Sequence, residues 1–165
     1  MNRKPVDALI TNKKGVDLIK GFEQLRTRSY YDQAGVITIG YGHTGPDVYP
    51  GQTISPQRAE ELFREDLEKR EVSLRAMVGV PLTENEFSAL VSWLYNVGSG
   101  NARSSTLIQI LNQGASPEDV ANQLLRWNKV RDPKTGKLIV SNGLVRRRKA
   151  EHDLYLDHGQ KKKFS

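Results

Sequence analysis

The chain has 165 residues, no cysteine, and 25 Lys and Arg against 19 Asp and Glu, which gives a formal net charge of +6. The length favours one domain that buries a core of its own, and the lack of cysteine excludes disulfides and thiolate metal sites. No apolar run approaches the roughly 18 residues of a membrane span, so no spanning helix is predicted. The positive charge indicates an anionic partner, which leaves nucleic acid, lipid head groups and cell-wall polymers as candidates.

A first helix is predicted to begin after Asn12, whose side chain can cap it. Val16, Ile19 and Glu23 follow at the spacing of one helix face. Three further apolar side chains widen that face: Leu18, Phe22 and Leu25. Glu23 is therefore expected at the edge of a buried stripe, where loss of hydration favours the neutral acid and raises the pKa of its carboxyl group.

A β-hairpin is predicted next. The segments RSYYDQ and VITIGYG have the alternation and the β-branched residues of strands, and the pair Ala34-Gly35 between them can form the turn. Asp32 would lie where the chain turns, among polar groups, and should stay ionised. Thr38 on the second strand can face back toward Asp32, so that a water could be held between its hydroxyl and the carboxylate.

Helices account for most of the remaining chain. Ser55-Pro56 opens a long amphipathic helix, with Ser as the cap and Pro in the first turn. Thr83 to Glu86 form a capping box in front of an apolar helix that ends near Gly98. Further helices are predicted from the patterns SSTLIQIL, SPEDVANQLLRW and GLVRRRKAEHDLYL, and DPKTGKLIVSNG is predicted to be a loop.

These elements predict an α+β fold that is mostly helical. A small N-terminal lobe with the hairpin is expected over residues 12–60, and a linking helix over 56–78 would join it to a helical C-terminal lobe over 79–158. Residues 159–165, which contain KKK, are expected to form a basic tail.

Neither a metal nor a cofactor is predicted. The three histidines, His43, His152 and His158, do not form a spaced ligand cluster, so His43 is expected to pair with a carboxylate. Basic residues gather in LVRRRKAEH and GQKKKFS, but no aromatic residues alternate with them and no nucleic-acid motif is visible. We therefore expect no nucleic-acid partner.

Glu23 and Asp32 together have the contrasting environments that acid-catalysed glycoside cleavage requires, although either acid alone would be read as a surface residue. Glu23, eight residues, Asp32, five residues, Thr38 and then IGYGH resemble the E-x8-D-x5-T signature of the phage-type, T4-like lysozymes, glycoside hydrolase family 24. Later segments resemble the family in the same order over Lys14 to Leu156: SPQRAEELFREDL, LVSWLYNVGSG, SSTLIQILN, RWNKV and GLVRRRKAE.

The resemblance implies a lysozyme-like fold and a phage endolysin. Such an enzyme hydrolyses the β-1,4 bond between N-acetylmuramic acid and N-acetylglucosamine of peptidoglycan to lyse the host cell. Glu23 would be the general acid, Asp32 the second carboxylate and Thr38 the residue that helps to orient the attacking water. The family likeness favours inversion of the anomer, but sequence leaves open the distance between the carboxyl groups, which separates inverting from retaining enzymes.

The resemblance also implies supporting residues. Cleft-lining positions fall on three residues: Tyr95, Asn96 and Thr106. His43 would pair with Asp66 and tie the hairpin to the long helix. One arginine among Arg146 to Arg148 would approach Glu23, and we favour Arg147. That partner would lower the pKa of Glu23, against the effect of desolvation, and sequence leaves open which effect prevails.

Two other functions fit part of the sequence. A lytic transglycosylase also needs a catalytic acid but no water-positioning Asp–Thr pair, and a basic module that binds nucleic acid or cell wall would use the arginine run and the lysine tail without catalysis. Lys161 to Lys163 suggest a contact with anionic lipopolysaccharide or with peptidoglycan.

We expect a monomer that stays in the host cytoplasm until it is released, with the help of a holin, and then acts in the periplasm on the cell wall. The segment MNRKPVDALITNKKG lacks the apolar core of a signal peptide. It is also too polar for the membrane-arrest signal of some family members.

Overall fold

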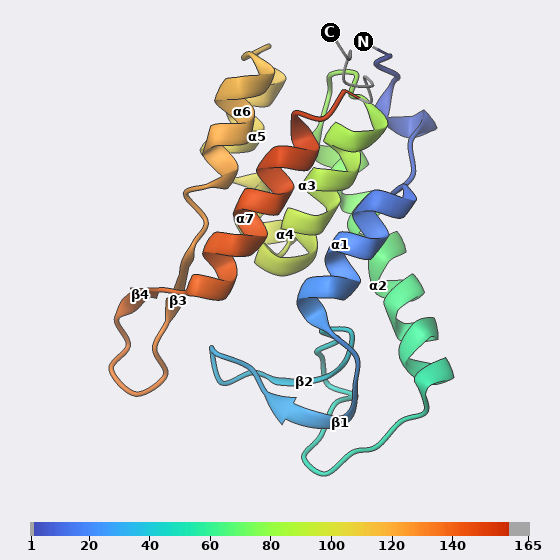
Figure 1. Ribbon diagram of the computed structural model, residues 1–165, viewed down its shortest axis with the longest axis vertical. Helices are drawn as coiled ribbons and strands as arrows, with labels where there is room; N and C mark the ends of the chain where they lie inside the picture. Colours follow the sequence, from blue (N-terminus) through green and yellow to red (C-terminus); the bar gives the residue numbers. More distant parts are fainter. Residues whose placement is uncertain (1, 159–165) are drawn as a thin grey trace, which may run out of the picture.

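The structure, a computed structural model, describes residues 2–158, so the predicted basic tail with Lys161 to Lys163 lies outside the described residues. Helices form the body of the molecule, and two small hairpins lie toward one end of it (Figure 1). In chain order the elements are η1 (Val6–Ala8), α1 (Lys13–Glu23), β1 (Arg26–Tyr31), β2 (Ile37–Gly40), α2 (Pro56–Met77), α3 (Glu84–Val97), α4 (Ser99–Arg103), α5 (Thr106–Asn112), α6 (Pro117–Leu124), β3 (Lys129–Arg131), β4 (Leu138–Val140) and α7 (Asn142–Tyr155).

The α+β class and the predicted order of long elements are confirmed. The β1–β2 hairpin lies beyond one end of α1, while α2 runs from the hairpin region back to the helical body (Figure 1). The predicted boundaries of the two lobes stay predictions. Among residues 2–158, none of the helices combines the length and the apolar character that a membrane crossing requires.

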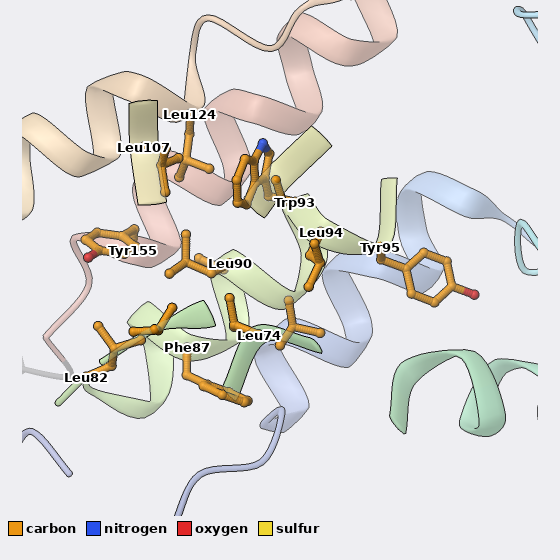
Figure 2. Close-up of a cluster of buried hydrophobic side chains, with 14 of the residues drawn as sticks. Leu74, Leu82, Phe87, Leu90, Trp93, Leu94, Tyr95, Leu107, Leu124 and Tyr155 are labelled. Atoms are coloured by element: carbon orange, nitrogen blue, oxygen red, sulfur yellow. The ribbon is translucent and has the colours of Figure 1, made fainter. Parts of the chain in front are cut away.

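Helix α3 lies at the centre of the helical body, between α1 and α7 in Figure 1. Every residue from Glu86 to Tyr95 is buried, as expected for a helix that is covered on all sides. Trp93, Phe87 and Leu90 anchor the core (Figure 2). The packing of α1 and α7 against this one helix fixes the positions of their side chains relative to each other.

Helix α1 begins as predicted, because the Asn12 side chain accepts a hydrogen bond from the backbone of Gly15. The predicted apolar face is wrong at its far end: Phe22 and Leu25 are 37% and 40% exposed. The helix packs on α3 around Gly15, where an added Cβ would lie 2.7 Å from the Cβ of Ser88, and it stops at Glu23. Phe22 and Leu25 lie beyond that contact, next to the turn into β1.

The first hairpin confirms its prediction. Strand β1 pairs with β2 in the antiparallel sense, with Tyr30 opposite Thr38 and Tyr31 opposite Ile37. Strand β2 ends at Gly40, which has φ +68°. Ile39 is completely buried and, with Val48 and Leu62, forms a small second core beneath the hairpin. This core seats the hairpin on α2.

The prediction of a loop for DPKTGKLIVSNG is wrong, because β3 and β4 pair across it as a second antiparallel hairpin. Each strand has only three residues, and the Asp-Pro and Thr-Gly pairs between them dominate the local sequence. Helix α4 was also not predicted. It follows Gly98 directly, contains Gly100 and has no side-chain cap.

The segment before α1 is ordered against the helical body, which the sequence did not indicate. The backbones of Lys4 and Leu82 exchange two hydrogen bonds of 2.8 and 2.9 Å. Arg3 pairs with the buried Glu86 at 2.8 Å. Glu86 also accepts the backbone N–H of Thr83 in the predicted capping box, which is complete. One buried carboxylate therefore fixes both the start of α3 and the N-terminal segment.

Removal of the capping hydroxyl should destabilise the fold. Thr83→Ala leaves the Glu86 N–H without its partner at a buried helix start, so we expect a loss of about 1–2 kcal/mol in the free energy of unfolding. Thr83→Ser keeps the hydroxyl and is the matched control. Urea denaturation of both variants measures the difference, and equal stability would contradict the role of the cap.

Candidate active site

Glu23 is the last residue of α1, and its side chain is 16% exposed. The loop after β2 passes directly over its carboxylate: a Cβ on Gly42 would lie 2.3 Å from Oε1 of Glu23. Gly42 also has φ +75°, which other residues rarely adopt. Glycine is therefore required at position 42, both for the turn and for the space that Glu23 fills.

Arg147 is the arginine that reaches Glu23. Its Nη1 donates to Oε2 of Glu23 at 2.5 Å, and its side chain is 4% exposed. Its other nitrogens donate to the backbone carbonyl of Ser92 at 3.0 Å and to Oε2 of Glu151 at 3.2 Å. Burial lowers the pKa of Arg147, but the charges of Glu23 and Glu151 outweigh it and hold the pKa above its usual value.

Glu151 is the centre of a buried charge cluster that the sequence reading missed. It is fully buried and lies 2.7 Å from Nε of Arg148, while its Oε2 accepts the hydroxyl of Ser92 at 2.6 Å. Glu151 thus pairs with both Arg147 and Arg148, and together with Glu23 it balances their two positive charges. Its spacing of four from Arg147 and three from Arg148 on one helix was the available signal. We call Glu23, Ser92, Arg147, Arg148 and Glu151 the charge cluster.

Asp32 lies at the turn of the first hairpin and is exposed. Its Oδ1 accepts the backbone N–H groups of Ala34 and Val36, both at 2.9 Å. The sequence reading placed this carboxylate in a wetter environment than Glu23, and the structure does the same. Two backbone donors fix the carboxylate relative to the turn, and both bind the same oxygen.

Thr38 is buried, at 3% exposed, and its hydroxyl donates to the carbonyl of Val36 at 2.8 Å. The same Val36 donates its N–H to Asp32. Thr38 and Asp32 are therefore linked through one residue, Val36. Since the hydroxyl proton is used, Thr38 can meet a water only as an acceptor, and its role toward an attacking water stays a prediction.

His43 pairs with Asp66 of α2, as the resemblance implies. Nδ1 of His43 lies 2.7 Å from Asp66, and Nε2 lies 2.8 Å from Asp47. The hydrogen bond to Asp66 raises the pKa of His43 above its usual 6.5, burial opposes the rise, and Asp47 adds to it. A protonated His43 donates to both carboxylates and ties the end of the hairpin to α2.

The three predicted substrate contacts lie in different surroundings. Tyr95 is buried, at 7% exposed, and its hydroxyl donates to the carbonyl of Tyr41 at 2.6 Å. Figure 2 shows the ring at the edge of the core with its hydroxyl pointing outward. Tyr95 therefore supports the segment before Gly42 rather than presenting a free surface. Asn96 and Thr106 are exposed, and their contacts with substrate stay predictions.

Within the described part of the chain, no group of three or more His, Asp and Glu residues is placed to hold a metal ion. The site offers two carboxyl groups in different surroundings. It has a largely buried carboxyl group beside a buried arginine, and an exposed carboxylate on a hairpin turn. That combination can donate a proton at one point and accept one at another.

Comparison with known proteins gives one consistent result. A family model described as Phage lysozyme matches residues 20–151. The endolysin of Bacillus phage B103 is 44% identical over 156 residues, which is 93% of this chain and 56% of that protein. The chain thus spans about half the length of this relative, and likewise of the endolysin of Bacillus phage PZA.

Two solved structures are similar to the whole fold. An endolysin from Escherichia coli O157:H7 phage FAHEc1 is 42% identical with a TM-score of 0.79, covering 88% of this chain and 92% of that one. The muramidase domain of SpmX from Asticaccaulis excentricus is 33% identical with a TM-score of 0.77, covering 88% and 96%.

Loss of Glu151 should destabilise the protein far more than loss of an exposed acid. Glu151→Gln leaves Arg147 and Arg148 buried with too little negative charge, so we expect a loss of about 3–5 kcal/mol in unfolding free energy. Asp153→Asn on the same helix breaks only exposed pairs and should cost at most about 1 kcal/mol. Chemical denaturation of both variants measures the two losses. Equal losses would contradict the conclusion that the charge cluster stabilises the fold.

The contact between His43 and Asp66 should stabilise the fold more at low pH than at high pH. Because the folded pKa is raised, its contribution is complete below about pH 6.5 and declines as the pH rises through the folded pKa. Asp66→Asn should therefore reduce stability most in acid, by about 1.5–3 kcal/mol, and less near pH 9. Denaturation over this range measures it. Asp17→Asn, at an exposed position, should show no such trend.

Proposed function

The chain belongs to the phage lysozyme family, and from that premise we propose that it is an endolysin that hydrolyses the β-1,4 bond between N-acetylmuramic acid and N-acetylglucosamine in peptidoglycan. The observation that carries this proposal is the pairing of a largely buried Glu23, held by the buried Arg147, with an exposed Asp32 on the neighbouring hairpin. Glycoside cleavage needs two carboxyl groups in such contrasting surroundings.

In the proposed reaction Glu23 gives its proton to the glycosidic oxygen. Its Oε2 is bound to Arg147, so the proton would be carried on Oε1, the oxygen that lies against Gly42. After transfer the carboxylate is negative, and Arg147 stabilises that charge without moving. The contact thus favours the products of proton transfer, and it fixes the direction in which the proton leaves.

Asp32 would act on the water. Its Oδ1 is held by two backbone N–H groups, so Oδ2 is the oxygen available to accept a proton from water. The water oxygen then bonds to the anomeric carbon from the face opposite the leaving group while that group takes the proton from Glu23. The anomer is inverted. The Thr38 hydroxyl oxygen is proposed to accept a hydrogen bond from the other O–H of this water and so to orient it.

The setting of the reaction is proposed as well. We assign the substrate as bacterial peptidoglycan, the working form as a monomer, and the route as storage in the host cytoplasm until a holin opens the way to the cell wall. Anionic lipopolysaccharide is a proposed contact of the basic tail, residues 159–165. Light scattering of the purified protein tests the monomer, and lysis with and without a co-expressed holin tests the route.

Glu23→Gln should abolish lysis of chloroform-treated Gram-negative cells. The amide keeps the shape but cannot donate the acid proton, so the release of reducing ends should fall by at least about 100-fold. Circular dichroism should show an unchanged fold. Asp17→Asn on the same helix is the control and should keep full activity. Full activity of Glu23→Gln would refute the assignment.

The first product should reveal the mechanism. Inversion gives the α-anomer of the new reducing end, which NMR detects before mutarotation. The β-anomer would indicate retention and would assign Asp32 as a nucleophile. An anhydro-sugar, lighter by one water in the mass spectrum, would instead indicate a lytic transglycosylase and would remove the roles proposed for Asp32 and Thr38.

A further inference from the structure

The second hairpin, which we call the β3–β4 ribbon (residues 129–140), is largely exposed. Its register places Lys129 opposite Val140 and Arg131 opposite Leu138, and paired residues share one face of a two-stranded ribbon. Leu138 and Val140 are 57% and 56% exposed, and both basic partners are exposed as well. One face of the ribbon therefore combines two cations with two uncovered apolar side chains.

The ribbon carries positive charge that its own residues do not neutralise. Its cations are Lys129, Arg131, Lys134 and Lys137, and Asp132 is its one acid. The Asp132 carboxylate is used inside the turn, where it accepts the backbone N–H of Lys134 at 3.0 Å and the hydroxyl of Thr135 at 3.2 Å. Within residues 2–158, the three lysine side chains take part in no ion pair.

The tip of the ribbon lies close to the turn of the first hairpin. A Cβ added to Gly35 would lie 3.6 Å from the Cβ of Pro133, which is ordinary van der Waals contact. Gly35 belongs to the turn whose backbone holds Asp32. Figure 1 shows both hairpins at the same end of the molecule. A glycan strand at Asp32 would therefore bring its substituents toward the ribbon.

We propose that the β3–β4 ribbon is a binding subsite for the acidic stem peptides of peptidoglycan. This inference rests on the proposed function, because it assumes a peptidoglycan strand at Glu23 and Asp32. Stem peptides carry free carboxylates, which suit Lys129, Lys134 and Lys137, and alanine methyl groups, which suit Leu138 and Val140. Charge complementarity and direct continuity with the Asp32 turn together select this occupant.

An anionic membrane is the competing partner of a basic and apolar surface, and the ribbon suits it less well. Insertion into lipid needs a face that is largely apolar, whereas Leu138 and Val140 share their face with Lys129 and Arg131. The opposite face has a single apolar pair, Val130 and Ile139, which is a small area for insertion. The tip that would enter the lipid also lies close to the first hairpin at Gly35. The ribbon is therefore better placed to contact a ligand bound beside the Asp32 turn than to insert into a membrane.

Binding can be tested without catalysis. All variants carry Glu23→Gln, and binding to purified sacculi is measured by co-sedimentation at low salt. The test variant adds Lys129→Gln, Lys134→Gln and Lys137→Gln. The control adds Lys13→Gln, Lys69→Gln and Lys149→Gln, which are also exposed and give the same net charge. Each is measured on native sacculi and on sacculi whose peptide carboxylates have been converted to amides.

We expect the test variant to bind native sacculi about fivefold or more weakly, and the control to change by less than about twofold. On amidated sacculi both should bind alike. Equal losses in the two variants would overturn the proposal in favour of a general charge effect. Equal loss by the test variant on native and amidated sacculi would also overturn it, since the contact would then be to the glycan.

Binding to lipid vesicles tests the alternative that the ribbon contacts an anionic membrane. If the test variant keeps its affinity for sacculi but loses binding to vesicles of anionic phospholipid, the ribbon is a membrane contact and the proposal fails. Failure of the proposed function is distinguishable from these outcomes. It would show as an absence of reducing ends or anhydro-sugars from sacculi treated with the unmodified protein, a measurement in which the ribbon variants play no part.

Discussion

The buried guanidinium of Arg147 is the interaction on which the rest of the site depends. It contacts Glu23 of α1, the Ser92 carbonyl of α3 and Glu151 of its own helix. A buried charge without a partner is strongly destabilising, so the three helices pack stably only when these groups meet. The planar group has donors in fixed directions, and the orientation of Glu23 is therefore set by the helical core.

The two candidate carboxyl groups are held by different means. Glu23 is positioned by a partner 124 residues away in sequence and by the close approach of Gly42. Asp32 is positioned by N–H groups two and four residues further along the chain. A change in helix packing would therefore displace Glu23 but would leave Asp32 in place. This division places the acid in a rigid, dry environment and the second carboxylate in a wet one, as their proposed roles require.

Local sequence signals predicted local structure well. Asn12, Ser55 and Thr83 cap helices as expected, because a cap is decided within a few residues. The β3–β4 ribbon was missed because its strands are too short to show a period beside strong turn signals. Phe22 was predicted to be buried but is partly exposed. Helical spacing shows which residues share a face, but it does not show how far along that face the neighbouring helix covers them.

The site was less predictable than the fold, for a physical reason. Spacing alone indicated Glu23 and Asp32 as a possible pair, and only the resemblance supplied Arg147 and the pairing of His43 with Asp66. Glu151 escaped notice although its spacing to Arg147 and Arg148 is visible. Such spacings are common on exposed helix faces, where they contribute little. Only burial makes this one decisive, and burial is a property of the assembled fold.

Burial also distinguishes the two groups of basic residues in the molecule, Arg147 and the lysines of the β3–β4 ribbon. Arg147 lies in the core beside Glu23, where mobile ions do not reach, so its effect on the acid should not depend on ionic strength. The lysines of the β3–β4 ribbon are exposed, so salt should screen them. If both proposals hold, added salt should raise the substrate concentration needed for half-maximal rate and leave the maximal rate unchanged. A fall in the maximal rate with the half-saturating concentration unaltered would show that screening reaches the acid and that the two features are not separate.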